Sequence, residues 1–201
     1  MALLDFIMPT KIYWDEATKT ETYGKLFVEP LERGFGITIG NALRRVLLSS
    51  LPGGAITAFK IMGVPHEFTT IKGVIEDVAE IVLNLKQIRL KIDENIERDF
   101  AILEVENIGK VYAKDIKFPA GIELVTPDIH ICTISEPIKL QMEFRVERGI
   151  GYKTVEELDP ISEIGWIIMD TAFSPIKKVS FNVEPTRVGD KTDYDKLILE
   201  I

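Results

Sequence analysis

The sequence has no cysteine pair and no long apolar run. Its single cysteine, Cys132, cannot form a disulfide within the chain, so nothing indicates an oxidising compartment. The longest stretch without a charged residue covers positions 46–59 and is interrupted by proline and two glycines, so it is too short for a membrane-spanning helix. The N-terminal residues include Asp5 and have no basic leader, which favours a cytoplasmic protein over a secreted one.

The sequence also lacks an excess of basic charge. Its 24 Lys and Arg face 32 Asp and Glu, which gives a net charge of −8. A domain that binds nucleic acid with its whole surface needs clustered cations, so this balance excludes that class and permits only local basic patches. The sequence has two basic pairs, Arg44-Arg45 and Lys177-Lys178. Aromatic residues do not alternate with the basic residues of these pairs, as a base-stacking surface would require, so the pairs are more typical of protein interfaces.

Alternation of apolar and polar residues predicts many short, half-buried antiparallel strands. The predicted strands cover residues 22–31, 55–62, 100–106, 138–147, 177–184 and 195–201. Apolar spacing of three and four predicts two helices, at residues 37–51 and 76–89, the second lying on a sheet. Residues 109–137 are rich in Gly and Pro and are expected to be mostly loops. This order of elements indicates an α+β fold rather than a repeated βαβ unit.

The first predicted helix has two different apolar stripes. Leu48 lies at the centre of the second stripe, between Arg44 and Arg45. It is either a single exposed leucine or the apolar centre of a partner contact with an arginine rim. The first stripe comprises Ile39, Ala42, Leu43, Val46, Leu47 and Ser50.

A glycine-rich turn precedes this helix and resembles a phosphate cradle. Gly34, Gly36 and Gly40 are spaced for a strand, a turn and a helix start. No Gly-Lys-Ser/Thr follows, and the position about 20 residues on is basic rather than acidic. Nucleotide binding therefore stays a minor alternative to a purely structural turn.

Other catalytic and metal signals are weak. His66 and His130 have no second ligand residue at metal-binding spacing. Asp193 and Asp195 share one face of a predicted strand and could hold Mg²⁺, but a third carboxylate is missing. The residues therefore predict no catalytic site, no metal and no cofactor.

Five long, collinear segments resemble the N-terminal domain of the bacterial RNA polymerase alpha subunit. These segments are EPLERGFGITIGNALRRVLLSSLPGGAIT, GVPHEFTTIKGVIEDVAEIVLNLK, RVERGIGY, DTAFSPIKKVSFNVE and TRVGDKTDYDKLILEI. The resemblance implies two interleaved subdomains, a dimerisation subdomain of residues 1–52 and 171–201 and an inserted subdomain of residues 53–170. It also implies a homodimer interface that includes Phe35, Ile39, Leu43, Val46 and Leu47.

The resemblance further implies contacts with the two large polymerase subunits, beta and beta-prime. Arg45 and Leu48 match one contact surface, Lys86 and Met169 match another, and His66 is a further addition. The implied function is that of a non-catalytic scaffold for transcription, whose dimer nucleates assembly of DNA-directed RNA polymerase. Nucleotide addition and its Mg²⁺ would then belong to the large subunits.

The sequence departs from the family pattern in three places. Lys153-Thr154 replace the usual Val-Pro-Ala after Tyr152, and Trp166 and Met169 are larger than in several members. Family members also continue past the position of Ile201 into another dimerisation helix, a linker and a DNA-binding domain. We therefore expect this chain to dimerise more weakly than a full N-terminal domain and to bind no DNA.

Overall fold

The computed structural model describes residues 7–189 and 191–201 of the chain. Its contacts divide the chain into two compact units. We call Met1–Leu51 with Ile176–Ile201 the terminal unit, and Pro52–Pro175 the central unit. Across the described residues, neither helix is long and apolar enough to cross a bilayer.

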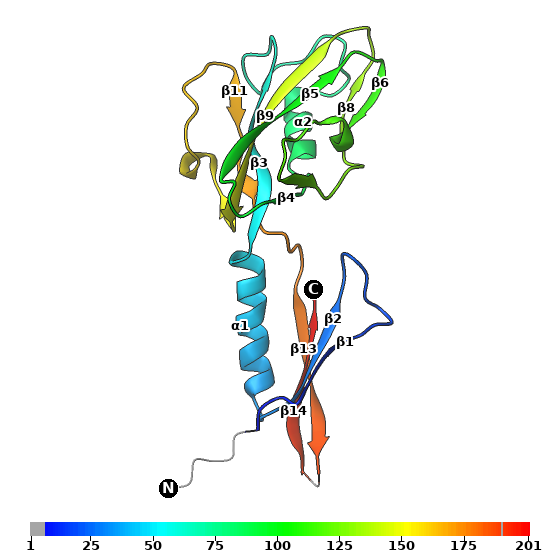
Figure 1. The fold of residues 1–201 in the computed structure, drawn as a ribbon, viewed down its shortest axis with the longest axis vertical. Coiled ribbons are helices and arrows are strands. Elements are labelled where there is room, and N and C mark those ends of the chain that lie inside the picture. Colours follow the sequence, from blue (N-terminus) through cyan, green and yellow to red (C-terminus); the bar gives the residue numbers. More distant parts are fainter. Residues whose placement is uncertain (1–6, 190) are drawn as a thin grey trace. The chain divides into compact units, whose positions relative to one another are not determined.

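The terminal unit is a four-stranded antiparallel sheet covered on one side by a helix (Figure 1). Strand β2 pairs with β14, so segments from opposite ends of the sequence form the middle of the sheet. Helix α1 lies against β13 and β14. In sheet order the strands are β1 (Lys11–Trp14), β2 (Lys25–Leu31), β14 (Lys191–Glu200) and β13 (Ser180–Val188), and α1 covers Phe35–Ser49.

Two glycines let α1 approach the sheet closely. A Cβ atom added at Gly36 would lie 2.7 Å from Val183 Cγ1, and one at Gly40 would lie 2.5 Å from Phe181 Cδ2. These two glycines are the only described residues of α1 that are fully buried. The small core below the helix consists of buried Val28, Leu31 and Leu197, with Leu26, Ile39, Leu43, Phe181 and Val183 packed around them.

The central unit is built on a six-stranded sheet in the order β5-β9-β3-β4-β7, with β11 paired to β3. Its strands are β3 (Pro52–Ile61), β4 (Leu90–Ile92), β5 (Arg98–Val105), β7 (Ile122–Leu124), β9 (Leu140–Ile150) and β11 (Trp166–Ile168). Two smaller sheets pair β6 (Gly109–Tyr112) with β8 (His130–Ile134), and β10 (Tyr152–Lys153) with β12 (Thr171–Ala172). Single 3-10 turns lie at Ala113–Asp115 and Val155–Glu157.

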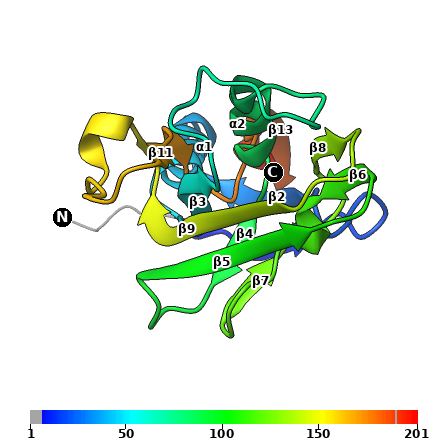
Figure 2. The same ribbon diagram turned by 90° about the horizontal axis from the view of Figure 1, so that it is seen from above.

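Helix α2 (Val78–Leu85) packs beside β8 and buries one apolar face in the core of the central unit (Figure 2). Asp77 caps its start, because the carboxylate accepts a hydrogen bond of 2.7 Å from the Glu80 N–H. The buried face consists of Val78, Ile81 and Leu85, at the spacing that places residues on one side of a helix.

The expected α+β class is confirmed by these antiparallel sheets and two α-helices. The second helix is shorter than predicted, because after Leu85 the chain forms a turn in which Ile88 N–H bonds to the Leu85 carbonyl. The prediction of mostly loops for residues 109–137 is wrong in part. Strands β6, β7 and β8 lie there, and they are too short to produce a clear alternating pattern.

A larger side chain at Gly40 should destabilise the terminal unit. In Gly40→Val the added atoms meet the Phe181 ring, and overpacking of this kind costs about 1–3 kcal/mol. Asn41→Val places the same side chain at the neighbouring exposed position and is the matched control. Urea unfolding should show a lower midpoint for Gly40→Val alone, and equal midpoints for the two variants would contradict the close approach.

Candidate functional site

The five residues expected at a dimer interface all lie on helix α1, but they differ in how far they are exposed. Ile39 and Leu43 pack against the core of their own sheet, and Leu47 is half-buried. Phe35 and Val46 are 41% and 50% exposed. The exposed pair therefore lies on the flank of α1 that continues from Ile39 and Leu43, and not on the glycine face.

The sheet has uncovered apolar residues on its α1 side. Trp14 of β1 pairs with Leu26 of β2, and Leu26 pairs in turn with Leu199 of β14. Ile12, Val28 and Leu197 are paired in the same way two residues along. Paired residues point to the same side of a sheet, so all six side chains lie on one side. Helix α1 covers β13 and β14 but leaves Ile12 64% and Trp14 38% exposed on the edge strand β1. This edge and the exposed flank of α1 present apolar surface on one side of the unit.

The opposite side of the sheet is occupied by aromatic, cation–π and hydrogen-bonding contacts within the unit. The Tyr13 ring stacks on Phe27 at 5.1 Å, and the Lys196 ammonium lies 4.6 Å from the centre of the same Phe27 ring. The Glu29 carboxylate accepts hydrogen bonds of 3.1 Å from the hydroxyls of Tyr13 and Thr186. This side has its own partners, so the apolar side is the better candidate for association.

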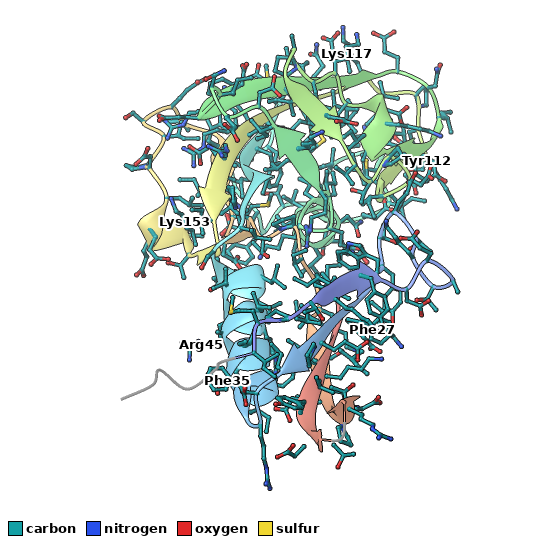
Figure 3. All side chains as sticks on the ribbon, turned by 60° about the horizontal axis from the view of Figure 1, so that its bottom comes forward. Phe27, Phe35, Arg45, Tyr112, Lys117 and Lys153 are labelled. Atoms are coloured by element: carbon teal, nitrogen blue, oxygen red, sulfur yellow. The ribbon has the colours of Figure 1, made fainter. Side chains whose placement is uncertain are left out.

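The second stripe of α1 carries Arg44, Arg45 and Leu48. Arg45 projects from the helix away from the sheet (Figure 3), and Leu48 is half-buried. Neither arginine forms an ion pair with another described residue. Two exposed guanidinium groups beside a leucine form a patch that suits a protein partner.

The start of α1 is closed by the chain's own carboxylate. Asp195 Oδ2 accepts hydrogen bonds from the N–H groups of Gly34, at 2.8 Å, and Gly36, at 3.1 Å. A phosphate would need the same N–H groups, so the alternative of a nucleotide cradle has no support here. Among the described residues, no three His, Cys, Asp or Glu side chains are grouped closely enough to hold a metal ion.

In the central unit, Lys86 contacts Asp170, the residue that follows Met169, which was expected at a large-subunit contact. Its ammonium forms an ion pair with Asp170, and the Tyr152 hydroxyl donates to the other oxygen of that carboxylate. These donors hold the pKa of Asp170 below its usual value of 3.8, with Lys86 contributing most. Met169 itself is 3% exposed and packs in the core, which does not fit the expected contact through its side chain.

The two histidines have different surroundings. His66 is exposed, and Thr69 donates a hydrogen bond of 2.8 Å to its backbone carbonyl. His130 Nε2 lies 2.9 Å from the Glu76 carboxylate, which also accepts a hydrogen bond from the Thr133 N–H. His66 is thus at the surface, whereas His130 is held by neighbours within the unit.

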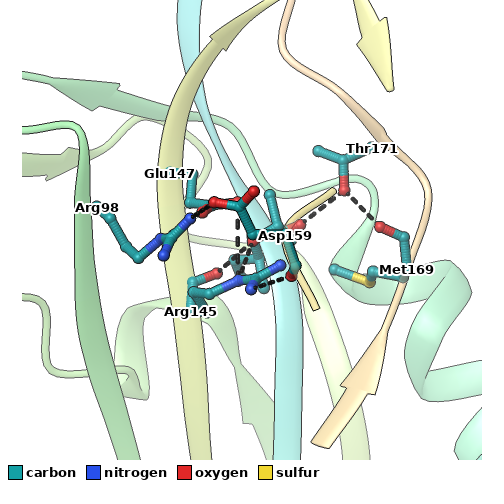
Figure 4. Close-up of polar contacts among 8 residues, drawn as sticks. Arg98, Arg145, Glu147, Asp159, Met169 and Thr171 are labelled. Carbon is teal, nitrogen blue, oxygen red and sulfur yellow. Dashed lines mark hydrogen bonds and ion pairs between the residues drawn. The ribbon is translucent and has the colours of Figure 1, made fainter. Parts of the chain in front are cut away.

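A buried arginine fixes the segment that follows β10 (Figure 4). Arg145 is 2% exposed, and its guanidinium donates to the Thr57 hydroxyl at 2.9 Å and the Asp159 carbonyl at 2.8 Å. Burial lowers the pKa of Arg145. Arg98 pairs with both Glu147 and Asp159. This cluster holds the segment to β3 and β9.

Sequence reasoning did not identify Asp170, Tyr152 or Asp195 in these roles. Asp170 directly follows Met169, so the expected position was one residue away from the carboxylate that pairs with Lys86. The sequence marks Asp195 only as a possible Mg²⁺ ligand, because a carboxylate that caps a helix 159 residues away leaves no local pattern.

The sequence matches known proteins along nearly its whole length. The family model described as RNA polymerase Rpb3/RpoA insert domain matches residues 59–174. The chain is 53% identical over 200 residues to the DNA-directed RNA polymerase subunit alpha of Aquifex aeolicus, covering 99% of this chain and 62% of the relative. It is 53% identical to the subunit of Hydrogenobaculum sp., with 98% and 61% covered, and 47% identical to that of Desulfovibrio desulfuricans, with 98% and 57% covered. The chain therefore spans about three fifths of the length of these relatives.

The Asp170 contacts predict a specific change on substitution of Lys86. In Lys86→Met the carboxylate loses its main donor, so its pKa should rise towards 3.8. Since the native pKa is depressed, this pair stabilises the fold above about pH 4, and the contribution is lost as the pH falls through the folded-state pKa. Carboxyl carbon NMR titration measures the shift. Lys91→Met, which removes an exposed ion pair with Glu123, is the control and should leave the Asp170 titration unchanged.

Proposed function

Because the chain belongs to the family of bacterial RNA polymerase alpha subunits with the Rpb3/RpoA insert domain, we propose that it is a scaffold subunit of DNA-directed RNA polymerase. In this proposal two copies associate and dock the beta and beta-prime subunits, which carry out nucleotide addition in the cytoplasm. This chain supplies binding surfaces and no catalytic group. The observation that carries the proposal is helix α1, with a glycine face towards its sheet and two further faces left for partners.

We propose that the homodimer forms on the apolar side of the terminal unit. Phe35 and Val46 on α1, with Ile12 and Trp14 on β1, supply exposed apolar area. Ile39, Leu43 and Leu47 form the base of this surface, where α1 meets the core. In a self-complementary interface the same patch serves both copies, which suits a pair of identical chains.

We propose two surfaces for the large subunits. In the terminal unit, Arg45 and Leu48 combine an apolar centre with an arginine, and arginine is enriched at energetic hot spots. In the central unit, Lys86 and its partner Asp170 provide the second surface, with His66 as a further contact. The proposal takes position 169 as a neighbour of this second surface, because the Met169 side chain is buried.

A charge on the exposed flank of α1 should weaken the dimer. Val46→Asp would bury an unpaired carboxylate, so we expect at least a tenfold loss of dimer affinity, which corresponds to ~1.4 kcal/mol or more. Asn41→Asp adds the same group at an exposed position on the other flank and is the control. Sedimentation equilibrium across a concentration series gives the affinities, and an unchanged Val46→Asp dimer would refute the assignment.

Removing the Arg45 side chain should impair docking of a large subunit. Truncation of an interface arginine at a hot spot costs about 2 kcal/mol or more, which is roughly a 30-fold loss of affinity. Arg33→Ala removes a second exposed guanidinium from the terminal unit as a control. Binding of each variant to purified beta subunit is measured by fluorescence titration. Equal affinities for Arg45→Ala and the unsubstituted chain would show that this stripe is not the docking surface.

A further inference from the structure

A small hollow lies beside the Lys86 contacts in the central unit. Its volume is about 90 Å³. The floor is formed by Ala55, Ile56, Leu85 and Ile88, all of which are at most 4% exposed. The floor is therefore apolar and preformed within the core.

The mouth of the hollow is polar but carries no net charge. Lys86 and Asp170 neutralise each other, and the remaining carboxylate oxygen accepts the Tyr152 hydroxyl. A charged side chain entering the hollow would lose its hydration against an apolar floor and find no free counter-charge at the mouth. The electrostatics therefore select an uncharged occupant.

The size of the hollow restricts the occupant further. A volume of about 90 Å³ is roughly three times the share of one water molecule in the liquid, ~30 Å³. It is smaller than the apolar cavities of about 150 Å³ that admit an aromatic ring. One branched aliphatic side chain fits these limits.

We propose that this hollow receives one aliphatic side chain of a large polymerase subunit. The inference rests on the proposed function, because Lys86 at the mouth belongs to the surface assigned to large-subunit binding. The Lys86 and Tyr152 groups shape the mouth, and the Tyr152 ring, 59% exposed, is available to pack beside the incoming segment. An aliphatic or aromatic side chain held in a pocket can serve as the central anchor of a protein interface.

Ala172 provides a way to close the hollow without altering its floor. It lines the hollow from β12 and is exposed, so a larger side chain can occupy the space from the surface. Ala172→Leu fills the site, and Ala172→Val fills it partly with a residue suited to a strand. Ala120→Leu, at an exposed position that does not line the hollow, is the matched control.

The test measures the affinity of the dimer for purified beta and beta-prime subunits separately, by fluorescence titration. We expect Ala172→Leu to weaken binding of one of them by 10- to 100-fold, Ala172→Val by less, and Ala120→Leu by under twofold. Melting temperatures of all variants confirm that they fold, and Ala172→Val keeps the test valid if Ala172→Leu does not.

Other outcomes separate this inference from the function on which it rests. If Ala172→Leu and Ala172→Val bind both subunits like the unsubstituted chain while Arg45→Ala does not, the anchor site is refuted and the scaffold role stands. Equal losses in Ala172→Leu and Ala120→Leu would also refute the anchor site. If the unsubstituted chain binds neither subunit, the proposed function fails together with the anchor site.

Discussion

The pairing of β2 with β14 is the constraint on which the terminal unit depends. Residues 25–31 and 195–200 are far apart in the sequence, yet they form the central ladder of one sheet. Closing such a long loop costs entropy, which the buried Val28, Leu31 and Leu197 must offset. Without this ladder α1 would have no sheet to pack on, because the strands it covers, β13 and β14, come from the C-terminal segment. The central unit is therefore an insertion between two segments that fold together.

Helix α1 contacts its sheet through small residues, while several of its larger residues stay at the surface. Gly36 and Gly40 bring the helix against β13, so the unit needs few large side chains on that face. Asp195 from β14 caps the start of the helix and ties its position to the same ladder. The bulky and charged residues of α1, among them Phe35, Val46 and Arg45, are thereby left at the surface.

Local patterns predicted the parts of the fold that depend on neighbouring residues. The alternating strands and the amphipathic helix α2 were predictable because one side of each element faces a core. The contact of α1 through glycines was not, because a helical wheel ranks apolar side chains and gives Gly36 no weight. The Lys86–Asp170 pair and the Asp195 cap link residues from distant segments, so no local spacing signals them. The expectation that Met169 contacts a partner stays a prediction, and the structure places that side chain in the core, one residue before the Asp170 carboxylate that pairs with Lys86.

Charge is distributed very unevenly between the two units. The terminal unit contains 11 Lys and Arg and 11 Asp and Glu, whereas the central unit contains 13 and 21, so the central unit accounts for the whole net charge of −8. Such a surface repels phosphate backbones and disfavours nonspecific binding of nucleic acid. The surfaces that we assign to partners nonetheless contain no unpaired acidic group, because Asp170 is paired with Lys86. They consist of apolar residues and arginine on α1, and of a neutralised mouth above an apolar hollow in the central unit. Specificity in both units then depends on shape and on desolvated contacts, while the acidic remainder limits competing interactions.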